Sequence, residues 1–191
     1  VSRATERMNY FVSGNFFDQD GIAMGSTFRR YSLRSNADVK TGEWLKMGTN
    51  TMLTYEEVQQ AEDGAYTLYT PISASRFMLP YWNPYKADGS VASSKDGSWE
   101  GTTQNPIEWM EDNPQLNQKY KMLSTVYAEV TPIKDLTLRT QLGIDFSHST
   151  TDMKSLPSFP GNNGIGSAGK ASANALQLTV TNTANYKFKV D

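Results

Sequence analysis

The feature that most constrains this chain is a strict alternation of apolar and polar side chains through several long segments. In residues 135–146, Leu138, Leu142 and Ile144 fall in one row, while Arg139 and Asp145 fall in the other. A period of two places such rows on opposite faces of a β-strand. The chain is therefore predicted to form a sheet with one apolar face and one polar face.

The segments with this pattern are long for strands. Six of them carry it, at residues 6–17, 29–39, 44–55, 120–131, 135–146 and 174–190. A strand of about 11 residues spans about 36 Å, whereas strands of soluble proteins more commonly have about 5–6 residues. A tilted strand that crosses a membrane needs about 9–11 residues. The length favours a transmembrane β-barrel over a soluble β-sandwich.

The connections between these segments alternate in length. Residues 40–43 and 131–135 form short turns, and Pro132 suits a turn because its ring fixes φ. The other connections, residues 18–28, 56–119 and 147–173, are much longer. Bacterial outer-membrane barrels have short periplasmic turns and long extracellular loops. The alternation therefore also favours a barrel of antiparallel, up-and-down strands.

Composition excludes several other classes. No apolar run is long enough for a membrane-spanning helix. The absence of cysteine excludes a disulfide framework and a thiolate metal site, and we expect no cofactor and no metal. A formal charge of −2 gives no sign of a nucleic-acid partner. The single histidine, His148, has no serine or carboxylate at a triad spacing, so we expect no enzyme activity.

The connection at residues 56–119 differs in character from the rest of the chain. It holds five of the eight prolines and three of the four tryptophans, and residues 56–118 carry ten acidic against three basic side chains. Its aromatic content argues against disorder. Four aromatic residues are candidates for contact with a ligand or a lid, since such rings bury much area at little entropic cost; they can equally pack the loop against itself. They are Tyr81, Trp82, Trp99 and Trp109.

Three stretches resemble one known family. They read NYFVSGNFFDQDGI at residues 9–22, FRRYSLRSNADVKTGEWLKMGTNTMLTY at 28–55 and YAEVTPIKDLTLRTQLGIDF at 127–146. The first two contain a tyrosine-rich strand ending in Ser-Gly and an aromatic residue, then Asp-Gln-Asp-Gly, then Arg-Tyr-Ser-Leu-Arg-x-Asn. The chain thereby resembles the SusC/RagA family of TonB-dependent outer-membrane transporters, and the third stretch resembles the next hairpin of that family.

The resemblance implies an importer of oligosaccharides or peptides in the outer membrane of a Gram-negative, Bacteroidetes-like bacterium. Members have a plug domain inside a barrel of about 22 strands, take energy from TonB and are capped by a SusD-like lipoprotein. Six strands cannot close such a barrel, and no signal peptide, TonB box or plug is visible in the sequence. We therefore expect residues 1–191 to be a single barrel segment that contributes wall and extracellular loops.

On this interpretation, the two faces of the sheet contact different environments, water on one side and lipid on the other. The polar row would line a water-filled lumen and pair within itself or with the plug; it contains Arg30, Arg34, Asn36, Arg139 and Asp145. The apolar row would face outer-membrane lipid; it contains Leu33, Val39, Leu136, Leu138 and Ile144. Aromatic residues near strand ends would form an interfacial girdle, namely Trp44, Tyr55, Tyr120 and Phe146. The alternative is a soluble β-sandwich that binds carbohydrate through Trp82, Trp99 and Trp109.

Overall fold

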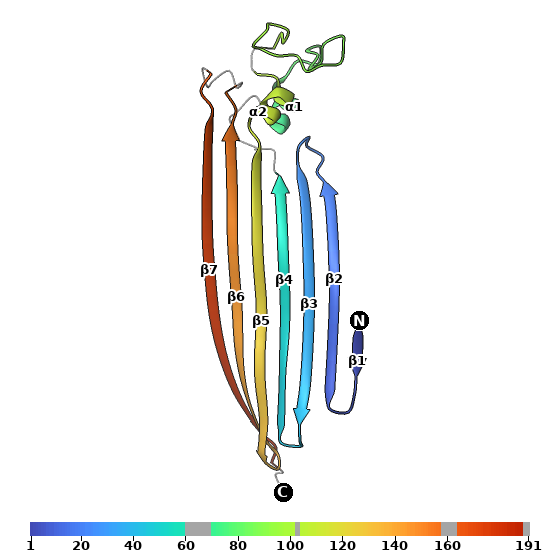
Figure 1. Cartoon of the computed structure of the whole chain (residues 1–191), viewed down its shortest axis with the longest axis vertical. Coiled ribbons are helices and arrows are strands. Elements are labelled where there is room, and N and C mark those ends of the chain that lie inside the picture. The colour runs from blue at the N-terminus through green and yellow to red at the C-terminus, as the bar shows by residue number, and fades with distance from the viewer. Residues whose placement is uncertain (60–69, 102–103, 158–163, 189–191) are drawn as a thin grey trace.

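A computed structural model describes residues 1–59, 70–101, 104–157 and 164–188. These residues form one seven-stranded antiparallel sheet in which each strand pairs with its neighbours in the sequence (Figure 1). The strands are β1 (Ser2–Ala4), β2 (Met8–Asp20), β3 (Thr27–Thr41), β4 (Leu45–Gln59), β5 (Gln115–Ile133), β6 (Leu136–Ser155) and β7 (Ser167–Tyr186). The short β1 lies at one edge of the sheet, and β7 lies at the other.

The six segments expected to be strands appear as β2 to β7, with 13 to 20 residues each. Most extend beyond the apolar alternation on which the expectation was based. At the end of β2, for example, Asp18 is followed by Gln19 and Asp20, yet all three residues pair with β3. Arg29 stabilises this end by ion pairs with Asp18 at 3.3 Å and Glu57 at 3.9 Å. The strand β1 was not predicted, since three residues are too few to show a period.

The short connections all lie at the same end of the sheet (Figure 1). Between β5 and β6 the turn is formed by Lys134 and Asp135, and Asp135 has a φ of 66°. Pro132 was expected in this turn, but it lies inside β5 within a bulge between Val130 and Ile133. Proline is tolerated there because a bulge leaves a residue outside the hydrogen-bond ladder.

The described parts of the long connections lie at the opposite end (Figure 1). These connections are residues 21–26, 60–114 and 156–166, shorter than expected because the strands are longer. The middle connection, which we call the long loop, contains two short helices that the sequence did not predict, α1 (Pro71–Phe77) and α2 (Pro106–Asp112). Each begins with proline in its first turn, a position where the missing N–H costs nothing.

Buried side chains are found mainly in the long loop rather than against the sheet. Of the buried residues, Tyr127 lies in a strand and the others lie between residues 70 and 112. The described residues contain no second sheet to cover the apolar face, so the β-sandwich alternative does not describe this part of the chain. No helix in the described ranges is long and apolar enough to cross a membrane.

Candidate functional site

The strand register sorts the side chains onto two faces. Arg34 lies opposite Met52 and Ser13, and the same row continues through Leu123 to Asp145. By the same pairing, all five residues predicted to face a lumen lie on one face, which we call the polar face: Arg30, Arg34, Asn36, Arg139 and Asp145. That this face lines a lumen stays a prediction.

Two of these five residues form ion pairs with the neighbouring strand β5. Arg139 lies 3.6 Å from Glu129, and Asp145 lies 3.5 Å from Lys121. No hydrogen bond or ion pair joins any two of the five in the described ranges, and the expected pairing with one another or with a plug stays a prediction. The Nε atom of Arg30 and the Oδ1 atom of Asn36 are buried and have no hydrogen-bond partner among the described residues.

A cluster around Tyr127 on the polar face was missed by the sequence analysis. The Tyr127 hydroxyl donates a hydrogen bond to Asp38, and the guanidinium of Arg139 lies 3.9 Å from the centre of the Tyr127 ring. The ring packs over Gly48, where an added Cβ would collide with both Tyr127 and Asp38. The available signal was the isolated glycine within a strand pattern, because such a glycine often marks a close approach to another group.

The opposite face, which we call the apolar face, carries the residues predicted to face lipid. Leu33, Val39, Leu136, Leu138 and Ile144 all lie on it by register. Leu33 is 46% exposed and Leu138 37% exposed. Exposed apolar surface of this extent is unusual for a soluble monomer and marks a face that another phase or partner covers.

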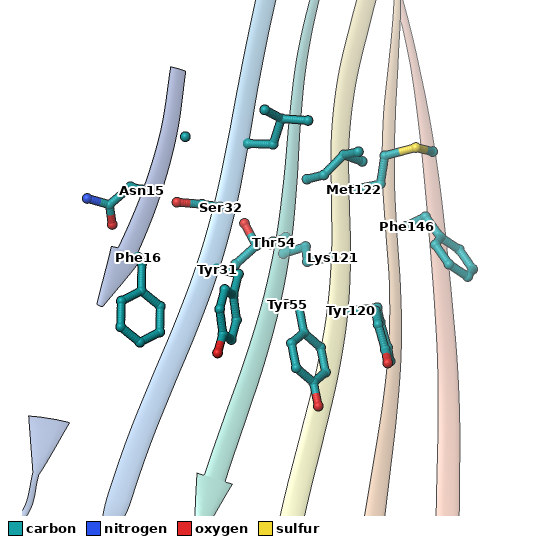
Figure 2. Close-up of a pocket in the computed structure, with 13 residues that line it drawn as sticks. Asn15, Phe16, Tyr31, Ser32, Thr54, Tyr55, Tyr120, Lys121, Met122 and Phe146 are labelled. Atoms are coloured by element: carbon teal, nitrogen blue, oxygen red, sulfur yellow. The ribbon is translucent and has the colours of Figure 1, made fainter. Parts of the chain in front are cut away.

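An aromatic row crosses the apolar face at the end with the long connections. Figure 2 shows four of its rings side by side on adjacent strands; the full row is Phe16, Tyr31, Tyr55, Tyr120 and His148. Neighbouring ring centroids are 4.9, 6.1, 4.7 and 6.4 Å apart. The row borders a shallow, mostly apolar groove of about 780 Å³. Of the residues expected in a girdle, Tyr55 and Tyr120 lie in this row.

The other two expected girdle residues lie elsewhere. Phe146 lies one row further along the apolar face, opposite Met122. Trp44 lies in the turn between β3 and β4 at the opposite end and is 59% exposed. At that end Tyr186 stacks on Phe188 at 6.4 Å. Aromatic side chains therefore lie at both ends of the apolar face.

The height of the apolar face matches a bilayer. On β5 it runs from Tyr120 to Val130, a rise of about 33 Å along the strand. At a strand tilt of about 40° this rise spans about 25 Å, the usual height of the apolar band of an outer-membrane barrel. Directly beyond the aromatic row, the next row on the same face carries Asp18, Arg29 and Glu57. The change from apolar to charged side chains takes place within one row.

The four aromatic candidates of the long loop lie in different environments. Trp99 is 6% exposed and Trp109 is 7% exposed, so both pack the interior of the loop. Tyr81 is 72% exposed. Trp82 is half-buried and contacts Trp99 edge to face, with ring centroids 6.1 Å apart. Tyr81 and Trp82 are therefore the candidates accessible from outside.

Polar groups hold the loop interior together. The side chain of Asn105 is fully buried, and its Nδ2 donates to the carbonyl oxygens of Pro84 and Ala92, both at 2.8 Å. Its Oδ1 accepts a hydrogen bond from the N–H of Ile107 and so caps α2. One buried amide thus ties three separate parts of the loop together.

A lysine forms ion pairs with both buried carboxylates of α2. The ammonium of Lys95 lies 3.1 Å from Glu108 and 3.0 Å from Asp112, and both carboxylates are buried. Burial alone would lower the pKa of Lys95, but its hydrogen bonds to Asp112 and Glu108 outweigh this and raise the pKa above its ordinary value. Within the described part of the chain, no group of three or more His, Asp or Glu is placed to hold a metal ion.

No protein-family model matches the chain. Two curated proteins from Formosa agariphila are similar to it: TonB-dependent receptor P26, 26% identical over 185 residues, and TonB-dependent receptor P3, 26% identical over 189 residues. Each alignment covers 97% of this chain and 18% of the relative. The chain therefore spans less than a fifth of the length of these curated relatives.

Solved structures similar to this chain also belong to a transporter. The RagAB peptide importer in its closed-closed state superposes on 100% of this chain with a TM-score of 0.85 at 28% identity, and the match covers 22% of that chain. The open-open state of the same importer gives a TM-score of 0.87 at 27% identity, over 21% of that chain. The resemblance to the SusC/RagA family is therefore confirmed. The predicted fold class is confirmed as far as the described residues reach: they are all-β, with antiparallel up-and-down strands in one open sheet, and they match about a fifth of a solved transporter chain.

Proposed function

We propose that this chain is a wall segment of a TonB-dependent outer-membrane importer, with its apolar face in lipid and its polar face lining the lumen. The observation that carries the proposal is the apolar band on one face of an uncovered sheet, about 25 Å high, with aromatic side chains at both ends. A soluble sheet has no reason to limit its exposed apolar side chains to the height of a bilayer.

The free edges of the sheet support the idea of a segment. In the described residues, β7 pairs with β6 alone, and β1 covers only residues 9–11 of β2. Lipid offers no partner for an unpaired backbone N–H or C=O, so strands within a membrane must continue until the barrel closes. Other strands of the complete protein would therefore pair with both edges.

For the polar face we propose contact with water and with a plug. The buried atoms Arg30 Nε and Asn36 Oδ1 lack partners within the described residues, and a plug or ordered water would satisfy them. Arg34 is exposed and points from the same face. These residues, with Arg139 and Asp145, would shape the path through the barrel and make or break no bond.

For the complete protein we propose import of peptides rather than oligosaccharides, because the similar solved structures are named as peptide importers. By resemblance to the SusC/RagA family, a SusD-like lipoprotein would cap the barrel and TonB would supply energy. The long connections, which lie at one end of the sheet, would then face the outside of the cell. The chain would have no catalytic role.

The proposal is tested on the full-length gene product in its native host. It should fractionate with outer membranes, shift its gel mobility on boiling, and support growth on a peptide mixture only when TonB is present. A full-length product that stays in the soluble fraction, or peptide uptake that is equal with and without TonB, would refute it.

A further inference from the structure

We propose that the long loop contains an anchor pocket for one large apolar side chain of an imported peptide, a specificity that rests on the importer function proposed above. The pocket has a volume of about 250 Å³ and lies between α1, α2 and the connection from β2 to β3. Its walls include Met24, Ala74, Met78, Trp82, Trp99 and Met110.

The size of the pocket limits what it can hold. Pockets for whole small molecules begin at about 300 Å³, so this pocket takes one side chain of a longer ligand. One wall is rigid, because the hydrogen bonds of Asn105 fix Pro84 and Ile107, which both line the pocket. The other wall has methionines, whose unbranched side chains adapt to occupants of different shape. A peptide importer that accepts many sequences needs such a combination.

The chemistry of the lining favours an apolar side chain over a sugar. Apart from the two indole N–H groups, Ser75 has the only polar side chain among the described lining residues, and its hydroxyl donates to the carbonyl oxygen of Ile72 at 2.7 Å. A sugar ring stacks well on tryptophan, but its buried hydroxyls would lack hydrogen-bond partners here, at a cost in free energy. An apolar side chain incurs no such cost.

The charged residues next in sequence to the pocket lining favour a cationic peptide. The exposed carboxylates Glu100 and Glu111 directly follow the lining residues Trp99 and Met110, and one exposed cation, Arg76, follows Ser75. Lys95 forms its ion pairs with the buried carboxylates of α2 and not with these two. The peptide that fits has a large apolar side chain near positive charges.

The experiment measures binding of two fluorescein-labelled octapeptides of alanine and lysine to the purified full-length protein. One peptide has a central phenylalanine and the other a central serine. The phenylalanine peptide should bind about tenfold more tightly, as burial of an aromatic side chain implies. Ser75→Trp, which fills the pocket from its rim, should abolish the difference; Ser90→Trp, at an exposed serine of the same loop outside the pocket, should preserve it. Met78→Gln keeps the side-chain volume and should reduce the difference.

Any of four results would overturn the anchor pocket. The two peptides can bind equally well, Ser75→Trp can leave their difference intact, or it can weaken binding of maltoheptaose while both peptides bind as before. Loss of association with a lipoprotein partner in Ser75→Trp, with the peptide difference unchanged, would assign the pocket to that partner and also refute the proposal. None of these results bears on TonB-dependent uptake, so the importer function is tested separately by the growth experiment described above.

Discussion

An arginine substituted at the centre of the apolar face tests which solvent this face contacts. Val126 lies in β5, six residues beyond Tyr120 of the aromatic row, about 20 Å along the strand. At a tilt of about 40° this is about 15 Å of depth, close to the middle of an apolar band about 25 Å high. Val126→Arg is therefore expected to cost about 2–4 kcal/mol of folding free energy in a membrane.

The matched control lies in the same strand on the polar face. Leu123 is 39% exposed and Val126 is 49% exposed, so a simple exposure argument treats them alike. Leu123 lies opposite Asp145, so Leu123→Arg places its charge in a wet lumen beside a carboxylate and should cost little. Urea unfolding of the full-length protein in phosphatidylcholine vesicles measures both variants. An equal loss of unfolding free energy in the two variants would refute the assignment of the faces.

Three further predictions concern individual contacts. Gly48→Val should destabilise the barrel by about 1–3 kcal/mol, because a side chain at this position collides with Tyr127. The temperature at which the gel mobility shifts measures this loss of stability, and an unchanged temperature would contradict the prediction. Asn105→Ala should cost the long loop about 2–4 kcal/mol, because it leaves buried backbone groups without partners; limited proteolysis should then cut within the loop and spare the strands. The pKa of Lys95 is raised on folding, so its ion pairs stabilise the loop fully below the unfolded pKa of 10.5 and lose this effect as pH rises through the folded pKa. Tryptophan fluorescence should shift to the red over that pH range. The variant Lys95→Arg should keep the loop folded to higher pH.

The sheet could be predicted because its physical cause is local. Alternation along 135–146 requires only that each strand lie between two different surroundings, and the register in the structure keeps Arg139 and Leu138 on opposite faces as that pattern implies. Strand ends next to the long connections were predicted too short, because beyond the apolar band both faces are polar and the alternation no longer marks the strand. At the other end of the sheet, the strand expected to run to residue 190 ends at Tyr186. The ion pairs of Arg29 continue the sheet where the pattern ends.

The polar-face contacts and the interior of the long loop could not be predicted in the same way. Gly48 and Tyr127 lie far apart in the sequence and meet only because β4 pairs with β5 in one register. Trp109 and Tyr81 have similar aromatic chemistry, yet one is buried and the other exposed. The two residues differ in exposure because Asn105 and Lys95 hold α2, which carries Trp109, in the interior of the loop. Composition does not reveal these contacts.

The most direct test of the two-faced wall compares adjacent positions in β6. Leu142 lies on the apolar face and Gln141 on the polar face, and residues 1–191 contain no cysteine, so only cysteines elsewhere in the full-length protein need to be replaced before labelling. A bimane label is attached to Leu142→Cys or Gln141→Cys in the full-length protein in vesicles. The label at 142 should be quenched by lipids with a nitroxide on the acyl chain and the label at 141 by aqueous iodide. Iodide quenching of both labels, with no effect of the nitroxide lipids, would contradict the proposal that this sheet is part of a membrane barrel.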